Sequence, residues 1–201
     1  MKRPKLVAVA GGSASGKTWL ADRLAEVLNP PALRLALDDF YRDLSHLAPA
    51  RRGRVNFDHP RAIDWSLLEE VLDELTRGRT VAAPGYDFAT HCRRPDPRRL
   101  VPRGVVVVEG LWLLRRPTLR ARFDLKVFLR CDAALRLERR LARDVRERGR
   151  SEESVRHQFE TQVEPMHARF VESQAHRADV VLDAPVGERE VARLAARITA
   201  L

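Results

Sequence analysis

The sequence predicts an α/β fold in which a mostly parallel sheet of about five strands is covered by helices on both faces. Short apolar runs alternate along the chain with longer stretches that carry apolar residues at helical spacing. Strands of a parallel sheet that is covered on both faces are apolar throughout, and these runs have that character. The length of 201 residues is typical of one domain, so we treat 1–201 as a single unit.

Five apolar runs carry the strand prediction. They cover residues 6–10, 33–37, 105–108, 125–129 and 178–182. The first run ends in two glycines, which predicts a buried strand that enters a tight turn. The third consists of four valines, and β-branched residues favour strands. Residues 80–90 mix β-formers with Pro84 and Gly85, which predicts a strand or a hairpin.

The helices are predicted from apolar spacing and from residues that suit helix ends. They are expected from Lys17 to Leu28, from Asp64 to Gly78, from Asp132 to Arg148, from Ser151 past Pro165, and around residues 191–198. Asp64 and Ser151 suit N-caps. Gly78 and Gly149 suit the residue that follows a helix. Pro165 predicts a kink, because proline cannot donate the backbone hydrogen bond.

The net charge and the cysteine content narrow the possible partners and the cellular location of the protein. The net charge of +9 suits nucleic acid, an anionic membrane surface, a small polyanionic substrate, or only a solvated arginine-rich surface. We expect no nucleic-acid partner, because no binding module is recognisable. We expect no membrane partner, because no apolar run approaches the roughly 20 residues that cross a bilayer. Cys92 and Cys131 lack a disulfide or zinc spacing. A cytoplasmic protein is expected, and homo-oligomerisation stays open.

A glycine-rich loop follows the first strand. It reads Gly11, Gly12, Ser13, Ala14, Ser15, Gly16, Lys17, Thr18 and matches the pattern G-x-x-x-x-G-K-[ST]. Glycines let several backbone N–H groups point at phosphates, and the following helix adds its positive end. Lys17 suits the β- and γ-phosphates, and the Thr18 hydroxyl suits Mg²⁺. The loop therefore predicts a P-loop that binds ATP or GTP with Mg²⁺.

Acidic residues end two further strands. Asp38 and Asp39 follow the second run, and Glu109 follows the four valines. Ligands bind beyond the carboxyl ends of strands in open parallel sheets, so these acids are expected beside the P-loop. A carboxylate at the position of Glu109 orients Mg²⁺ or its water. One of the two aspartates suits an acceptor hydroxyl whose proton it takes, but chemistry alone does not separate Asp38 from Asp39.

One face of the helix that begins at Asp132 is rich in arginine. Arg136, Arg139, Arg140, Arg143 and Arg146 fall within about 120° of arc, and Ala134, Leu137, Leu141 and Val145 occupy the opposite face. Two interpretations stay open. The stripe is either a lid over about 132–160 that neutralises the transferring phosphate and excludes water, or a solvated helix face.

Several segments together resemble the uridine kinase (uridine–cytidine kinase) family. They are GGSASGKT at 11–18, DDFY at 38–41, NFDHP at 56–60, YDFATH at 86–91, VEG at 108–110 and RRLARDVRERGRS at 139–151. The resemblance spans nearly the whole chain. It implies a P-loop NTPase-type core with an arginine-rich helical lid and a small substrate-covering hairpin at about 79–103. It also implies transfer of the γ-phosphate of ATP or GTP, with Mg²⁺, to the 5′-hydroxyl of uridine or cytidine.

The resemblance also implies roles for single residues. Asp38 resembles the catalytic aspartate that also contacts the substrate, and Thr18, Glu109 and Asp38 lie on the metal side. The other positions that match the substrate-binding or nucleotide-binding positions of the family are Asp58 for the ribose, Tyr86 and His91 for the pyrimidine, Arg140, Arg143 and Arg148 of the lid, and Gln158. Arg143 and Lys17 would act on the transferring phosphate.

The chain departs from the family at a few places. Asp39 stands where the family usually has Ser, and the loop at 92–103, with three prolines and five arginines, is unusually basic. The alternative functions are a related kinase that acts on pantothenate, phosphoribulose or nicotinamide riboside, and a nucleic-acid-dependent ATPase. The preferences for uridine or cytidine and for ATP or GTP stay open.

Overall fold

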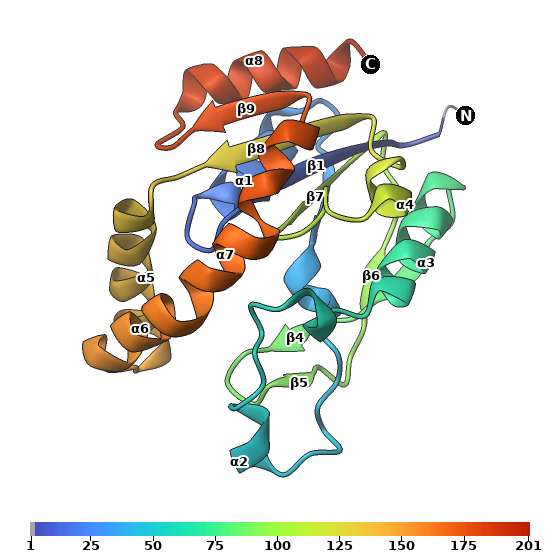
Figure 1. Cartoon of the computed structure of the whole chain (residues 1–201). Helices are drawn as coiled ribbons and strands as arrows, with labels where there is room; N and C mark the ends of the chain where they lie inside the picture. The colour runs from blue at the N-terminus through green and yellow to red at the C-terminus, as the bar shows by residue number, and fades with distance from the viewer. Residues whose placement is uncertain (1–2) are drawn as a thin grey trace.

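A parallel sheet forms the centre of the molecule. The computed structural model describes residues 3–201, apart from the side chain of Arg148. In this part of the chain, five parallel strands lie in the order β2-β7-β1-β8-β9 (Figure 1). The order reverses direction at β1, so the loop after β1 lies at the switch point where α/β sheets bind ligands. The predicted fold class is confirmed.

The bounds of the elements are as follows. The strands are β1 (Lys5–Gly11), β2 (Leu33–Ala36), β3 (Val81–Ala83), β4 (Tyr86–Asp87), β5 (Cys92–Arg93), β6 (Arg98–Leu100), β7 (Val105–Gly110), β8 (Leu125–Arg130) and β9 (Val180–Asp183). The α-helices are α1 (Lys17–Val27), α2 (Pro49–Arg52), α3 (Trp65–Thr76), α4 (Pro117–Arg120), α5 (Ala133–Arg148), α6 (Glu152–Gln158), α7 (Glu164–Phe170) and α8 (Glu188–Thr199). Short 3₁₀ turns cover Leu37–Phe40, Pro60–Ala62 and Glu172–Arg177.

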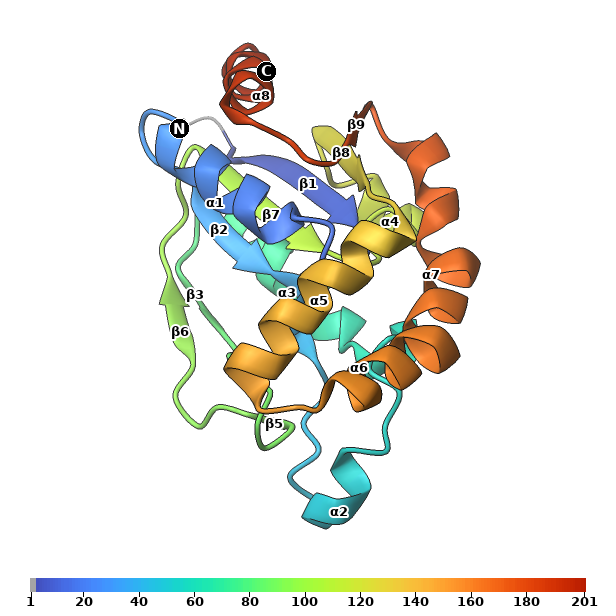
Figure 2. The same cartoon turned by 90° about the vertical axis from the view of Figure 1, so that its left-hand side faces the viewer.

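Each face of the sheet has its own apolar core. Leu6 and Ala8 of β1 pack into a cluster with α3 and the end of α7, whereas Val7 and Val9 pack into a second cluster with α1 and α8. Successive side chains of a strand point to opposite faces, so an apolar run fills both clusters. Figures 1 and 2 show α1 and α8 on one side of the sheet and α3 and α7 on the other.

Helix ends follow the predicted capping residues closely. Asp64 accepts a hydrogen bond from the backbone N–H of Leu67, and Ser151 accepts one from Ser154. Gly149 ends α5 with a φ of 61°, a conformation that glycine adopts without a steric penalty. The kink expected at Pro165 takes the form of a π-helical stretch, Phe159–Val163, between α6 and α7. Proline lacks the N–H needed for a regular α-helical ladder, which accounts for the break just before it.

The segment predicted as a strand or hairpin forms two antiparallel ladders. The outer ladder pairs β3 with β6, and the inner ladder pairs β4 with β5. Prolines at 95 and 97 lie between β5 and β6, where they do not interrupt a ladder. The basic stretch at 92–103 is thus part of a long, two-part hairpin rather than a simple loop.

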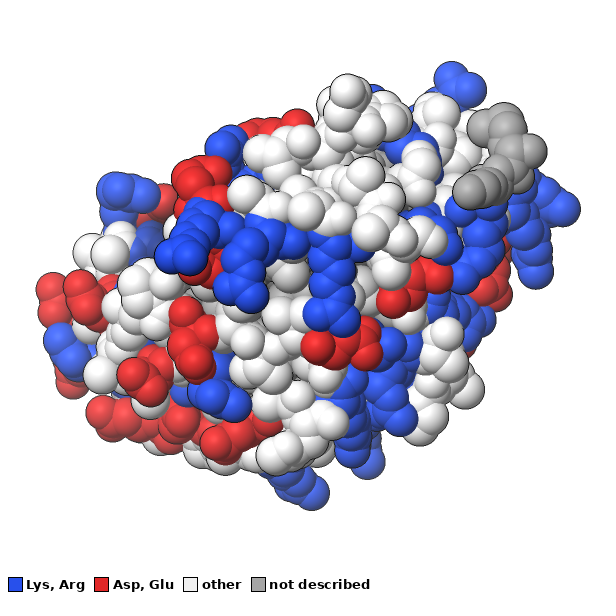
Figure 3. All heavy atoms as spheres, turned by 90° about the horizontal axis from the view of Figure 1, so that it is seen from above, with Lys and Arg blue, Asp and Glu red and all other residues white. Residues whose placement is uncertain are grey.

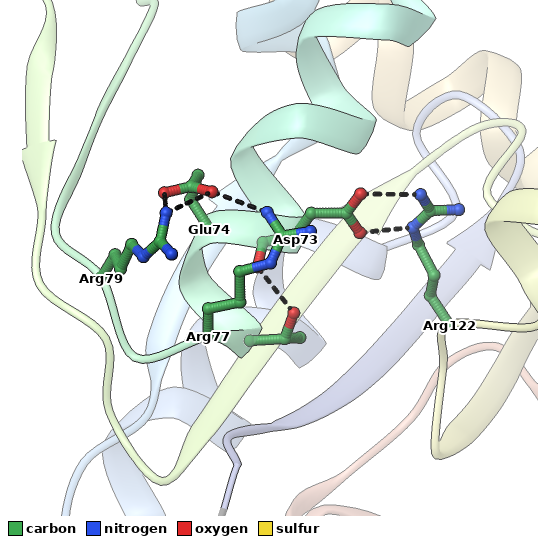
Figure 4. Close-up of polar contacts among 6 residues, drawn as sticks. Asp73, Glu74, Arg77, Arg79 and Arg122 are labelled. Atoms are coloured by element: carbon green, nitrogen blue, oxygen red, sulfur yellow. Dashed lines mark hydrogen bonds and ion pairs between the residues drawn. The ribbon is translucent and has the colours of Figure 1, made fainter.

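Charged side chains also tie elements together. Arg122, which follows α4, makes two hydrogen bonds of 2.9 and 3.0 Å to Asp73 near the end of α3, and Glu74 pairs with Arg77 and Arg79 (Figure 4). Figure 3 shows basic and acidic side chains interspersed over the face that carries α8. No helix in residues 3–201 is long and apolar enough to cross a bilayer.

Candidate functional site

The P-loop bends tightly between β1 and α1. Gly16 has a φ of 100° and Ala14 a φ of 61°, so the loop passes twice through the left-handed region. A Cβ on Gly11 would lie 2.7 Å from the carbonyl oxygen of Leu129, and one on Gly12 would lie 2.8 Å from Nδ1 of His167. Such approaches are closer than side-chain atoms tolerate. The two glycines therefore let neighbouring groups pack directly against the loop.

Lys17 and Thr18 meet the predicted acid of β7. The hydroxyl of Thr18 donates to Oε1 of Glu109 over 3.3 Å, and Nζ of Lys17 lies 4.0 Å from Oε2. Arg34 of β2 donates to the same carboxylate over 3.1 Å. Burial raises the pKa of Glu109, while Lys17 and Arg34 oppose that shift. Glu109 is thus a buried carboxylate that directly contacts the P-loop.

Asp38 lies in the 3₁₀ turn that ends β2. The strand was predicted to reach residue 37, but Leu37 already belongs to the turn. One carboxylate oxygen of Asp38, Oδ1, is buried and makes no hydrogen bond within the described residues. Asp38 lines a cavity of about 630 Å³ together with Thr18, Tyr86, Glu109 and Arg143. An unsatisfied buried oxygen is costly, so its presence at a cavity points to a ligand.

The side chain of Asp39, unlike Oδ1 of Asp38, has a partner within the protein. Arg98 of β6 donates to its carboxylate over 3.1 Å, and both side chains line the same cavity as Asp38. Burial raises the pKa of Asp39, and the Arg98 guanidinium opposes the shift. An ion pair therefore connects Asp39 with the basic stretch at 92–103.

Aromatic rings gather beside the inner ladder. The ring centre of Tyr86 lies 5.1 Å from that of Tyr41 and 5.5 Å from that of Phe88. His91 stacks on Phe57 with ring centres 4.7 Å apart and nearly parallel planes. Burial raises the pKa of Tyr86 far above its usual value, and its hydroxyl oxygen has no hydrogen-bond partner among the described residues. Tyr86 thus packs in the apolar core and also lines the cavity that contains Asp38.

Asp58 lies beside the P-loop and α7. It lines a small cavity with Ser13, Trp112 and His167. Burial raises the pKa of Asp58, and the nearby positive charge of Arg140 opposes the shift. Burial in turn lowers the pKa of Arg140, opposed by Asp58. The two groups therefore stabilise each other's charged form in a poorly solvated place.

The arginine stripe of α5 faces inward. Arg136 is 1% exposed and Arg140 is 5% exposed, whereas Val145 on the opposite face is 39% exposed. Arg139 donates to the carbonyl of Ser15 over 2.9 Å, which joins α5 to the P-loop. Of the two interpretations, a solvated helix face is therefore wrong for the first turns of α5. The contact between α5 and the P-loop is thus made by guanidinium groups rather than by apolar side chains.

A buried acid organises the second half of the stripe. Asp144 is fully buried and accepts from Nε of Arg143 at 2.8 Å, with Nε of Arg140 at 3.4 Å and a terminal nitrogen of Arg150 at 3.7 Å. Arg140 also donates to Gln158 over 2.8 Å. The acid holds the guanidinium groups in one orientation without cancelling their combined charge.

The predicted residues do not all open onto one cavity. Thr18, Asp38, Tyr86, Glu109 and Arg143 line the large cavity, whereas Asp58, His91, Arg140 and Gln158 do not appear in its lining. The side chain of Arg148 lies outside what the structure describes. Sequence reasoning missed Arg34, His167 and Phe57. Arg34 could have been found, because it lies on the predicted strand 33–37, which two aspartates follow directly. His167 carries no motif.

A P-loop between β1 and α1, an acid at the end of β7 and inward-facing arginines define a P-loop kinase. The family model described as phosphoribulokinase / uridine kinase family matches residues 6–191. This chain belongs to that family and is an ATP-dependent phosphotransferase.

Named relatives and solved structures agree with this assignment. The chain is 46% identical over 179 residues to the uridine kinase of Chloroflexus aurantiacus, which covers 89% of this chain and 86% of the relative. It is 41% identical over 183 residues to the uridine kinase of Brevibacillus brevis, with 90% and 86% coverage.

Two solved structures share the fold. The phosphoribulokinase of Rhodobacter spheroides has a TM-score of 0.67 at 18% identity, over 91% of this chain and 71% of that chain. A D-glycerate 3-kinase from Cryptococcus neoformans has a TM-score of 0.64 at 21% identity, over 83% and 79%.

Proposed function

We propose that this protein transfers the γ-phosphate of ATP or GTP to the 5′-hydroxyl of uridine or cytidine, with Mg²⁺, in the cytoplasm. The observation that carries the proposal is the shared cavity of Thr18, Asp38, Tyr86, Glu109 and Arg143. It joins a phosphate-binding end to an aromatic end that suits a flat base. The named relatives at 41% and 46% identity are uridine kinases, which supports the same acceptor.

The oxygens at the phosphate end fit Mg²⁺. The Thr18 hydroxyl and the Glu109 carboxylate lie 3.3 Å apart, and Asp38 has an unsatisfied oxygen at the same cavity. Mg²⁺ prefers oxygen ligands and is usually held by one or two carboxylates together with substrate phosphates. Thr18 and Glu109, with Asp38, would hold it. When bound, the ion neutralises negative charge on the phosphates.

Asp38 is proposed to act on the acceptor hydroxyl. Its unpaired oxygen is free to accept the proton of a 5′-hydroxyl, which orients that oxygen for attack on the γ-phosphorus. Lys17 and Arg143 are proposed to stabilise the charge that is spread over the phosphate oxygens in the transition state. Asp58 is proposed to bind the ribose, and Tyr86 and His91 the pyrimidine.

The lid is proposed to close over the triphosphate. Arg139 and Arg140 already reach the P-loop through Ser15 and Ser13. Guanidinium groups in a water-poor site stabilise phosphate charge more strongly than in open solvent. We therefore assign about 132–160 to the lid and about 79–103 to the hairpin that covers the acceptor, within one domain of residues 1–201.

The first experiment is a product assay. Purified protein, Mg²⁺ and either ATP or GTP are mixed with uridine, cytidine, pantothenate, a phosphoribulokinase substrate and nicotinamide riboside. Phosphorylated uridine or cytidine is the expected product. Turnover of a non-nucleoside acceptor alone would refute the proposed acceptor but leave the kinase assignment intact.

The second experiment tests Asp38 as the base. Asp38→Asn is expected to abolish transfer while nucleotide binding survives, because an amide oxygen is a poor proton acceptor. Asp179→Asn, at the far edge of the sheet where Asp179 pairs with Lys126, is the matched control. Retention of most of the turnover by Asp38→Asn removes it from the role of base.

A further inference from the structure

An arginine-lined cavity lies apart from the phosphate-transfer site. It has a volume of about 680 Å³ and is lined by Arg42, Arg61, Arg115, Arg116 and Arg169, with His59 and an apolar floor. Its lining shares no residue with the cavity of Thr18, Asp38 and Glu109. The volume lies within the range of small-molecule sites, about 300–1,000 Å³.

Four of the five arginines lack carboxylate partners. In the described residues, Arg116 pairs with Glu69 over 3.5 Å, while Arg42, Arg61, Arg115 and Arg169 make no ion pair. No acid belongs to the lining of the cavity. Arg122, by contrast, is paired with Asp73 at 2.9 Å. Four unpaired guanidinium groups around one hollow therefore create a local excess of positive charge.

Aromatic and apolar groups hold the arginines in place. The guanidinium carbons of Arg115 and Arg169 each lie 5.0 Å from the centre of the Phe170 ring, and that of Arg116 lies 5.4 Å from Trp65. Phe170 is 8% exposed and Ile63 is fully buried, so the floor of the cavity is apolar. A guanidinium group held over an aromatic ring still presents N–H donors at its edge, where an anion can accept them.

The surroundings of His59 also reflect this charge. Burial and the nearby guanidinium groups of Arg61, Arg169 and Arg115 lower the pKa of His59, so its neutral form is favoured. A neutral imidazole adds a hydrogen-bond donor without further repulsion.

We propose that this cavity binds a small anion that carries several phosphate groups in a chain. Arginine recognises phosphate through its planar fork of N–H donors, and several converging arginines suit more than one phosphate group. The anion is either a free polyphosphate chain or the phosphate tail of a nucleotide. His59, which lines this cavity, directly follows in sequence Asp58, the residue proposed to bind the ribose.

The test is a titration in which the P-loop is already occupied. The protein is saturated with a non-hydrolysable ATP analogue and Mg²⁺, and inorganic tripolyphosphate is then added in a calorimeter. One further equivalent is expected to bind. Arg115→Ser/Arg169→Ser is expected to weaken this binding about tenfold or more, since each 1.4 kcal/mol is a factor of ten and charge-assisted bonds are lost. The absence of a second equivalent overturns the proposal.

The control removes the same charge elsewhere. Arg189→Ser/Arg193→Ser changes two exposed arginines of α8 and is expected to leave the affinity for tripolyphosphate unchanged. Equal weakening by both double variants would show only general charge attraction, which also overturns the proposal. Circular dichroism and binding of the ATP analogue check folding, and Arg61→Ser supplies a milder second variant.

Further titrations identify the source of the phosphates. Tighter binding of a nucleoside triphosphate than of tripolyphosphate, lost in Arg115→Ser/Arg169→Ser, would assign the site to a nucleotide. Equal affinities would assign it to the phosphate chain itself. Equally tight binding of inorganic phosphate would contradict a site for several phosphate groups.

Discussion

Replacing the buried acid of α5 tests how the arginines of the proposed lid are held. Asp144 is fully buried and contacts Arg140, Arg143 and Arg150 at 2.8 to 3.7 Å. Asp144→Asn keeps the shape but removes the negative charge, so Arg140, which is almost as deeply buried, loses a compensating partner. Breaking a buried ion pair by removing one partner costs about 3–5 kcal/mol. We take about 3, because the side chains of Arg143 and Arg150 are 33% and 29% exposed and partly solvated.

This cost is large enough to measure by thermal unfolding. For a chain of this length, 1 kcal/mol shifts Tm by about 2–4 °C, so Asp144→Asn is expected to lower Tm by roughly 6–12 °C. The rate of nucleoside phosphorylation should fall as well, because Arg143 lines the transfer cavity.

A second acid of the same helix provides the control. Glu147 is 51% exposed and pairs with Arg146 over 2.6 Å. Exposed pairs contribute about 1 kcal/mol or less, so Glu147→Gln should lower Tm by only a few degrees. If Asp144→Asn lowers Tm no more than Glu147→Gln does, the buried acid does not hold the arginines of α5 in place and the reasoning is refuted.

Three other predictions concern buried or paired polar groups. Asp58→Asn should raise Tm at neutral pH and abolish phosphorylation. Burial raises the folded-state pKa of Asp58, so its destabilising effect grows as pH rises through that value; the Tm gain should vanish near pH 4. Gln174→Met should cost about 2–3 kcal/mol by urea unfolding, because the buried N–H of Leu114 loses its acceptor at 2.9 Å; a change below 0.5 kcal/mol, roughly the size of a neutral surface substitution, contradicts this. Arg98→Ser should lower kcat/KM several-fold, and adding Asp39→Ser should restore it, whereas a double variant no better than the single one argues against their coupling.

The P-loop and the sheet were predictable because their signals are local. A glycine-rich loop between an apolar strand and an amphipathic helix requires only a short segment, and Asp64 caps α3 through a contact three residues away. The end of β2 was harder to predict from the sequence. Leu37 is apolar enough to continue the strand, but the chain turns there, and a Cβ on Gly110 would lie 2.3 Å from its Cβ. That close contact between two strand ends involves residues far apart in sequence.

The direction of the arginine stripe could not be predicted from periodicity. Periodicity shows that arginines and apolar residues lie on opposite faces of α5, and burial usually favours the apolar face. Here the arginine face is buried, because the carbonyl of Ser15 and the carboxylates of Asp144 and Glu164 supply its hydrogen bonds. These partners lie on other elements or on the same face, and only the fold brings them together.

The contact between Asp39 and the basic hairpin could not be predicted from the sequence either. In the sequence they are two separate features, 59 residues apart. In the fold, Arg98 reaches Asp39 at the edge of the cavity that contains Asp38, so the added negative charge beside the proposed base is offset by an added positive one. Without Arg98, two adjacent carboxylates would repel each other at the cavity with no positive partner for Asp39. The positive charge of Arg98 therefore balances the negative charge of Asp39 beside the proposed base.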